Sequence, residues 1–94
     1  MRVLNTKVLE SYMAKHARCR GPVRAWLSET RMAEWASPAE LKERYPGASI
    51  LSGNRVVFDL AGNNYRLVCV VAYRTSVVVV ERIGTHAEYD KWDL

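Results

Sequence analysis

The sequence has few cysteines, few histidines and no long apolar run, and each shortage excludes a class of protein. Cys19 and Cys69 are the only cysteines, and their spacing fits neither a metal-ligand set nor a redox pair. With His16 and His86 as the only histidines, a zinc site is not expected. No apolar stretch approaches the roughly 20 residues of a membrane span, and residues 1–7 lack the apolar core of a secretory signal. We therefore expect a cytoplasmic protein with no metal, no cofactor and no membrane partner.

Length and charge predict one small basic domain. A chain of 94 residues supplies one modest core, so residues 1–94 are expected to form a single domain. The 14 lysines and arginines outnumber the 10 acidic residues, which gives a net charge of +4. Excess positive charge on a small domain attracts polyanions, nucleic acid first. Arginine is the main source of this excess, and its guanidinium binds phosphate through two parallel hydrogen bonds.

Three apolar runs rich in β-branched residues predict the centre of the fold. In the first run Val56, Phe58 and Leu60 alternate with other residues, which is the period of a half-buried strand. The three runs are residues 55–60, 65–73 and 77–83. The turn-forming segments between them are residues 61–64 and 74–76. Because a parallel crossover needs a dozen residues or more, connections this short require antiparallel pairing. The sequence therefore predicts a three-stranded antiparallel meander.

Helical patterns occupy the N-terminal half. Residues 1–4 are expected to form a short edge strand or a docked arm. Two amphipathic helices follow, the first capped by Asn5 or Thr6 and the second with Pro22 at its first position. Their apolar stripes are Val8, Leu9, Tyr12 and Met13 in one helix and Val23, Trp26, Leu27 and Thr30 in the other. We expect the two helices to form a hairpin across one face of the sheet.

Two shorter helices carry clear start signals. Ser37 is expected to cap a short helix with Pro38 at its first position. Thr85 is expected to cap a C-terminal helix, and Glu88, three residues later, completes the spacing of a capping box. The predicted fold class is α+β, with an N-terminal helical hairpin packed on one face of an antiparallel β-sheet meander and a short C-terminal helix.

Strand parity assigns side chains to the two faces of the sheet. Leu67 belongs to the bulkier apolar set and is expected to face the helices, which places Arg66 on the open face. The third strand is apolar on both faces, so the pattern does not decide which of its residues face the helices. If Val77 and Val79 do, Arg82 lies on the open face with Arg66. An arginine-bearing open face is a candidate seat for a phosphate backbone, and the alternative is an ordinary solvated face. The RNA-binding candidates are Arg55, Arg74, Arg82 and Lys91.

The densest group of reactive side chains lies at residues 84–91. His86 can exchange a proton near neutral pH, and Tyr89 lies one helical turn further on the same side. Asp90 is four residues from His86 and can orient its imidazole. His16 is expected to lie on a distant helix. The structural alternative is a capped C-terminal helix whose Tyr89 and Trp92 pack on the sheet edge.

Two motifs stand in order in the second half of the chain: R-V-V-F-D-L-A-G-N-N-Y-R-L-V at residues 55–68 and G-T-H-A-E-Y-D-K at residues 84–91. With these motifs the sequence resembles the HigB family of toxins from bacterial type II toxin–antitoxin systems. The piece S-P-A-E-L-K-E-R-Y-P-G-A-S at residues 37–49 also resembles that family, and the similarity covers about residues 35–92. It implies a RelE/ParE-like fold, an endoribonuclease that cuts mRNA, usually in the ribosomal A site, and a helix-turn-helix antitoxin of the HigA type.

The residues at hand suit such a reaction. RNA cleavage without a metal activates a 2′-hydroxyl against the adjacent phosphate and needs a proton acceptor, a proton donor and cations around the phosphorane. The catalytic candidates are His86, Tyr89 and Arg66, with Asp90 as the orienting residue and either His86 or Tyr89 as acid or base. The expected partners are mRNA, the ribosome and the antitoxin. The alternative is a non-catalytic RelE/ParE-like toxin or binding module that acts on another target, such as gyrase.

Overall fold

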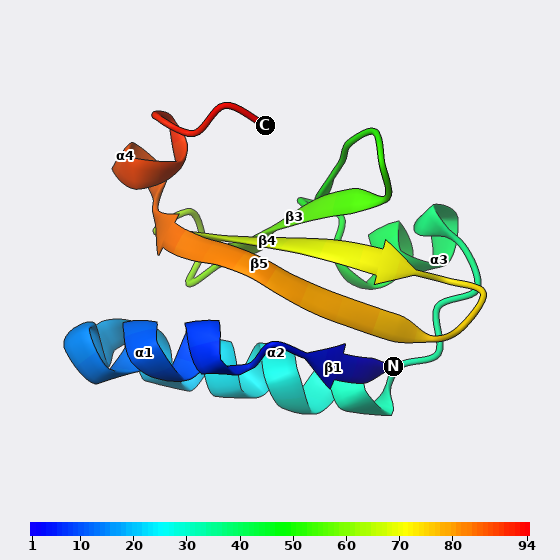
Figure 1. The fold of residues 1–94 in the computed structure, drawn as a ribbon, viewed down its shortest axis with the longest axis horizontal. Coiled ribbons are helices and arrows are strands. Elements are labelled where there is room, and N and C mark those ends of the chain that lie inside the picture. The colour runs from blue at the N-terminus through cyan, green and yellow to red at the C-terminus, as the bar shows by residue number, and fades with distance from the viewer.

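A computed structural model describes all of residues 1–94 and shows helices on one side of a sheet. The elements in chain order are β1 (Arg2–Leu4), α1 (Lys7–Lys15), the 3₁₀ helix η1 (Ala17–Cys19), α2 (Arg20–Met32), α3 (Pro38–Arg44), β2 (Ser49–Ile50), β3 (Arg55–Leu60), β4 (Tyr65–Ala72), β5 (Val77–Thr85) and α4 (His86–Tyr89). In Figure 1, α1 and α2 lie below β3, β4 and β5, and α4 lies above these strands. None of the helices combines the length and the apolar character needed to cross a lipid bilayer. The α+β class predicted from the sequence is confirmed.

The sheet is the predicted meander extended by a short strand at each edge. Its order is β1-β5-β4-β3-β2, and β3, β4 and β5 pair antiparallel as expected. At one edge β2 pairs antiparallel with β3, while at the other β1 pairs parallel with β5, Arg2 lying opposite Val77. The sheet is therefore mixed and not purely antiparallel. Apolar periodicity indicates that a segment is extended, but it does not give the direction of its neighbour.

The helical hairpin covers one face of the sheet, as predicted, but its break lies earlier in the chain. The backbone leaves the helical conformation at His16, where φ is −131° and ψ is 81°, and α2 already begins at Arg20. Pro22 is thus the third residue of α2 and not the first. A proline is tolerated there because the first four N–H groups of a helix have no partner within it.

The core lies between this hairpin and the helix-facing side of the sheet. Leu9, Val23 and Trp26 from the helices are buried in one cluster with predicted inward residues of β3 and β4. Phe58 lies at the centre of an aromatic group, with ring centroids 5.3 Å from Trp26, 5.2 Å from Tyr45 and 6.2 Å from Trp35. Leu67, Cys69 and Val71 belong to this cluster and the equally buried Val68 does not, so the parity predicted for β4 is confirmed.

The parity of β5 depends on an irregularity that the sequence did not indicate. Val78 and Val80 are buried in the core cluster, so it is these residues, and not Val77 and Val79, that face the helices. The pairing with β4 then shifts, because Cys69 pairs with Val80 and Val68 pairs with Arg82, which leaves Glu81 as an extra residue. Such a bulge moves the following side chains to the other face. Arg82 therefore lies on the same face as Arg66, although Val77 and Val79 do not face the helices.

Candidate functional site

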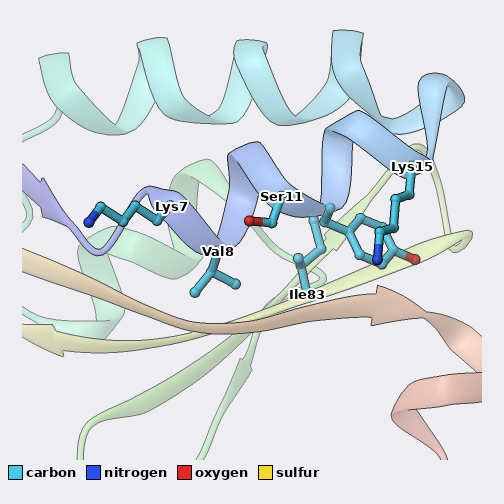
Figure 2. Close-up of a pocket in the computed structure, with 6 residues that line it drawn as sticks. Lys7, Val8, Ser11, Lys15 and Ile83 are labelled. Carbon is cyan, nitrogen blue, oxygen red and sulfur yellow. The ribbon is translucent and has the colours of Figure 1, made fainter.

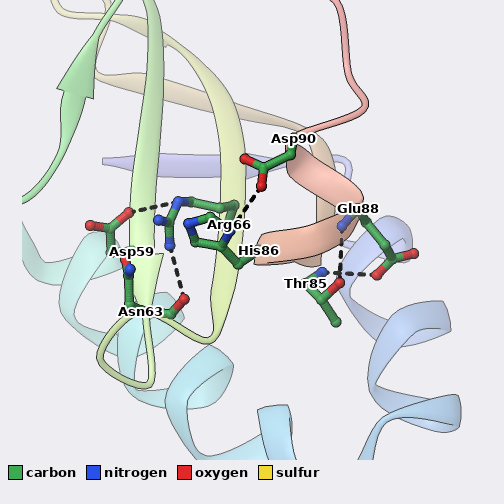
Figure 3. Close-up of polar contacts among 7 residues, drawn as sticks. All are labelled: Asp59, Asn63, Arg66, Thr85, His86, Glu88 and Asp90. Atoms are coloured by element: carbon green, nitrogen blue, oxygen red, sulfur yellow. Dashed lines mark hydrogen bonds and ion pairs between the residues drawn. The ribbon is translucent and has the colours of Figure 1, made fainter.

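The start of α4 is tied to the end of β5. The Thr85 side-chain oxygen accepts a hydrogen bond from the Glu88 N–H at 3.1 Å, and Glu88 Oε1 accepts one from the Thr85 N–H at 2.8 Å. This is the capping box predicted from the spacing of the two residues (Figure 3). Because two helix-end donors are satisfied reciprocally, α4 begins at a defined point at the rim of the sheet. The predicted Ser37 cap of α3 is also present, with Pro38 at the first position of that helix.

His86 is the first residue of α4 and is anchored through its backbone and one ring nitrogen. Its N–H donates to the Asn64 carbonyl in the β3–β4 turn at 3.1 Å. Its Nδ1 lies 3.2 Å from Asp90 Oδ2, and the side chain is 47 % exposed. A carboxylate at Nδ1 fixes the orientation of the ring. The second ring nitrogen, Nε2, has no polar partner in the chain.

Arg66 lies on the predicted face but is not open to solvent. The residue is 9 % exposed, its Nε lies 3.2 Å from Asp59 Oδ1, and its Nη1 donates to the Asn63 carbonyl at 3.2 Å. Its guanidinium carbon lies 5.6 Å from the centre of the Tyr89 ring. The prediction of an open arginine is therefore wrong. Parity gives the face of a strand residue but not what covers that face, and here the C-terminal segment folds back over it.

The C-terminal segment packs on this face through aromatic rings. The Tyr89 and Trp92 rings meet edge to face with centroids 5.9 Å apart. A Cβ added at Gly84 would lie 2.8 Å from the Trp92 ring, so the absence of a side chain at Gly84 allows this approach. Tyr89 thus has the packing role that the structural alternative assigns to it. The tyrosine hydroxyls that hydrogen-bond within the chain are those of Tyr12 and Tyr45, so the Tyr89 hydroxyl has no partner there.

The remaining basic candidates are not all brought together. Arg82 lies over the Trp92 ring at 5.6 Å, and Lys91 follows α4 and is exposed. Arg55 is on the same face, but its Nε is 2.9 Å from Glu81 Oε1, so its charge is already paired. Arg74 lies in the β4–β5 turn at the far end of the sheet, about 26 Å from Arg66 along an extended strand. Arg74 is therefore remote from the residues at the start of α4, and its part in RNA binding stays a prediction.

A second cluster on the helix side of the rim was not predicted. The Tyr12 hydroxyl donates to Glu88 Oε1 at 3.0 Å, which links α1 to α4. The His16 ring stacks on Tyr12 with centroids 3.9 Å apart, so the expectation that His16 lies far from the C-terminal residues is wrong. The sequence carries no signal for a contact between residues 76 positions apart. This link forms because α1 runs along β5 and ends beside the start of α4.

The link affects the ionisation of both partners. Hydrogen bonds hold the pKa of the Glu88 carboxyl below its usual value. The larger effect comes from the Thr85 N–H and a smaller one from the Tyr12 hydroxyl. The pKa of Tyr12 is raised mainly by burial of its hydroxyl and, to a smaller extent, by the carboxylate of Glu88. The ionised form of Glu88 is therefore the form that holds α4 against α1.

Tyr12→Phe is expected to lower the free energy of unfolding at neutral pH by about 0.5–1 kcal/mol, the net value of one solvent-exposed hydrogen bond. Because the pKa of Glu88 is depressed in the folded state, this contribution is present above its unfolded pKa and is lost as pH falls through its folded pKa. Urea unfolding of both proteins at neutral pH and at about pH 3, below the ordinary range of glutamate, measures the difference. An equal difference at both pH values would contradict a role for the ionised carboxylate.

Comparison with known proteins gives one finding. Residues 19–92 match the family model HigB_toxin, described as the RelE-like toxic component of a toxin-antitoxin system. No curated protein sequence matches the chain. The matched range includes the residues around α4 and excludes β1 and α1.

Proposed function

The chain belongs to the HigB family of RelE-like toxins of toxin–antitoxin systems, and on this premise we propose that it is an endoribonuclease that cuts mRNA on the ribosome. Cleavage would stop translation in the cytoplasm of the host cell. We further propose that the antitoxin implied by the family is a helix-turn-helix protein of the HigA type, which keeps the toxin inactive until it is needed.

The observation that carries the proposal is the convergence of three chemically different groups at the start of α4. His86 has a ring nitrogen oriented by Asp90, at 3.2 Å. Tyr89 presents an unbonded hydroxyl, and its ring lies against the guanidinium of Arg66 at 5.6 Å. Metal-free RNA cleavage needs a proton acceptor, a proton donor and a cation, and an imidazole, a phenol and a guanidinium can supply these three functions.

In the proposed reaction the ribose 2′-oxygen attacks the adjacent phosphorus, and the bond to the 5′-oxygen of the next nucleotide breaks. One group of the pair His86 and Tyr89 accepts the 2′-hydroxyl proton, and the other donates a proton to the leaving 5′-oxygen. The products are a 2′,3′-cyclic phosphate and a 5′-hydroxyl. Both assignments of acid and base stay open, because the two side chains lie three residues apart on the single turn of α4.

Positive charge near the phosphate completes the site. Two of the three guanidinium nitrogens of Arg66 are bonded to Asp59 and Asn63, while Nη2 has no partner in the chain and remains for a phosphate oxygen. A cation held in place before the reaction stabilises developing negative charge without reorganising. Arg82 and Lys91 lie further out and are proposed to hold the flanking phosphates. Arg66 also forms a buried ion pair, so its substitution would test folding and cleavage together.

Expression of the chain alone in a bacterial host is expected to arrest growth and to produce mRNA fragments cut within coding sequences. The chain with His86→Ala, expressed at the same level, is the matched control and is expected to permit growth. Growth curves, primer extension on abundant transcripts and immunoblotting for protein level make the comparison. Normal growth with intact mRNA would refute the proposed activity. Arrest with intact mRNA and altered DNA supercoiling would favour the non-catalytic alternative that acts on gyrase.

A further inference from the structure

A small pocket lies beside β3, next to Arg66. Its volume is about 290 Å³, and we call it the Asp59 pocket; its walls include Arg44, Tyr45, Gly47, Asp59 and Gly62. Asp59 pairs with Arg66 across β3 and β4, so the pocket adjoins the guanidinium that meets Tyr89. Sites for drug-sized ligands measure roughly 300–1,000 Å³. A pocket slightly smaller than these suits a single nucleobase.

The Asp59 carboxylate gives this pocket an unused hydrogen-bond acceptor. Its Oδ1 lies 3.2 Å from Arg66 Nε, and the side chain is 30 % exposed. Its Oδ2 has no polar partner in the chain and points away from Arg66 in Figure 3. A Cβ added at Gly47 would lie 3.2 Å from this oxygen, so the absence of a side chain at Gly47 leaves room beside it. Because each carboxylate oxygen has two acceptor sites, Oδ1 can accept a second hydrogen bond while it holds Arg66.

Flat side chains form another wall of the pocket. The Arg44 guanidinium lies over the Tyr45 ring, with its carbon 4.9 Å from the ring centre. An ion pair with Glu29 holds this guanidinium in place, and the Arg44 side chain is 56 % exposed. Unstacked RNA bases stack on aromatic rings and on guanidinium planes. The wall can therefore support a base whose edge meets Asp59.

We propose that the Asp59 pocket binds a guanine base of the mRNA, next to the phosphate that Arg66 holds. The Watson–Crick edge of guanine presents two adjacent donors, N1–H and N2–H, which match the two oxygens of a carboxylate. Adenine, cytosine and uracil each place an acceptor beside a donor on that edge, and this acceptor would face a carboxylate oxygen. The inference rests on the proposed function and names the base that the same site selects.

The alternative occupant is an arginine of a protein partner, because a guanidinium carries a similar pair of parallel donors. Charge favours guanine. The carboxylate of Asp59 is already paired with Arg66, and Arg44 lines the same pocket. A third guanidinium would enter between two others of the same charge, whereas a neutral base brings the two donors without this repulsion.

A groove between α1 and β5 determines which measurement is informative (Figure 2). Lys7, Ser11 and Lys15 are among its lining residues, and no acidic residue lines it. A lysine ammonium is a point charge that attracts phosphate, so this groove is expected to hold nucleotides whatever their base. Nucleotides that share a phosphate and differ only in the base remove this contribution from the comparison.

Titration of the isotope-labelled chain with guanosine 3′-monophosphate, followed by nuclear magnetic resonance, is the direct probe. We expect this nucleotide to bind about tenfold more tightly than inosine 3′-monophosphate, which lacks the N2 amine, and than adenosine 3′-monophosphate. One good bidentate contact discriminates between bases by about this factor. The amide signals of Gly47 and Gly62 are expected to shift most with guanosine.

Three variants test the role of the pocket. Asp59→Asn keeps the shape of the side chain and is expected to lose the preference for guanosine over adenosine, because an amide matches an edge with one donor and one acceptor. Gly47→Ala places a methyl group against Oδ2 and is expected to weaken guanosine binding severalfold. Gly21→Ala is the matched control, since a Cβ there meets no other atom, and it is expected to bind like the wild type. A thermal melt of each variant checks its fold.

Equal binding of the three nucleotides by the wild type would overturn the inference, as would guanosine binding that neither Asp59→Asn nor Gly47→Ala changes. N-acetylarginine amide that binds more tightly than guanosine, and loses its binding in Asp59→Asn, would assign the pocket to an arginine of a protein partner. Cleavage of ribosome-bound mRNA is a separate readout, with guanine expected at one fixed position beside the cut. A protein that prefers guanosine without cutting RNA contradicts only the proposed activity, and one that cuts without regard to guanine contradicts only this inference.

Discussion

His86→Ala is expected to slow cleavage of ribosome-bound mRNA by about 10²–10⁴-fold, the usual contribution of one general acid or base. The fold is expected to survive, because the His86 side chain is 47 % exposed and its polar partner in the chain is Asp90. Its structural bond is made by the backbone N–H to Asn64, which alanine keeps. The start of α4 is likewise held by Thr85 and Glu88.

Tyr89→Phe isolates the hydroxyl from the packing of the ring. Phenylalanine keeps the contacts with Arg66 and Trp92 and removes only an oxygen that has no partner in the chain. A rate loss of about 10²-fold or more would therefore report chemistry, since the proton-transfer contribution is what changes. The structural alternative predicts instead that this substitution leaves the rate per folded molecule unchanged.

Single-turnover cleavage of mRNA on purified ribosomes, beside a thermal melt for each protein, separates these readings. Asp90→Asn is a useful third variant, because it keeps the shape of the side chain beside His86 Nδ1 and removes its charge. It is expected to give a smaller loss than His86→Ala. If His86→Ala and Tyr89→Phe both cut at the wild-type rate, α4 does not carry the chemistry, and the cationic residues alone would have to account for toxicity.

Phe58→Ala is expected to lower the free energy of unfolding by about 3–5 kcal/mol, the range for truncating a buried aromatic ring. Phe58 is fully buried and is surrounded by the rings of Trp26, Trp35 and Tyr45. These rings come from α2, from the segment before α3 and from the residue after it, so the cavity would lie where several elements meet. Stabilities of small domains are about 5–15 kcal/mol, and this variant is expected to lose a large part of its own.

Chemical unfolding monitored by tryptophan fluorescence measures the effect. Phe58→Leu fills most of the volume and is expected to fall between Phe58→Ala and the wild type. Met32→Ala is the surface control: Met32 is 84 % exposed, so a change within about 0.5 kcal/mol is expected. A loss at Phe58 no larger than the loss at Met32 would show that the aromatic group does not hold the helices on the sheet.

Local pattern was enough to predict much of the architecture. Alternation over residues 55–60, short turns and β-branched runs predicted β3, β4 and β5 and their antiparallel order. The caps at Ser37 and Thr85 were predicted from side chains a few positions apart. The contact between His86 and Asp90 spans a single helical turn. These features were accessible because each depends on residues that are neighbours in the chain, where geometry follows from the 3.6- and 2-residue periods.

Other features depended on segments that are remote in sequence. The bulge at Glu81 reversed the parity of β5, and a single extra residue leaves no mark on an apolar run. The burial of Arg66 depends on the C-terminal segment, which folds back across β4. The separation of Arg74 from Arg66 follows from the length of that strand. In each case the sequence indicates the type and chain position of the residue, but not which distant segment packs against it.

The sequence by itself determined the meander, the helix caps and the residues with chemical capacity at the start of α4. Only the tertiary structure decided which cation meets Tyr89, how α1 is linked to α4 through Tyr12 and Glu88, and where the pairing of β5 with β1 ends. The physical reason is the range of the interactions. Backbone conformation and capping are set within one turn or one strand pair, whereas burial, ion pairing and edge exposure are set by whichever distant segment packs against a residue.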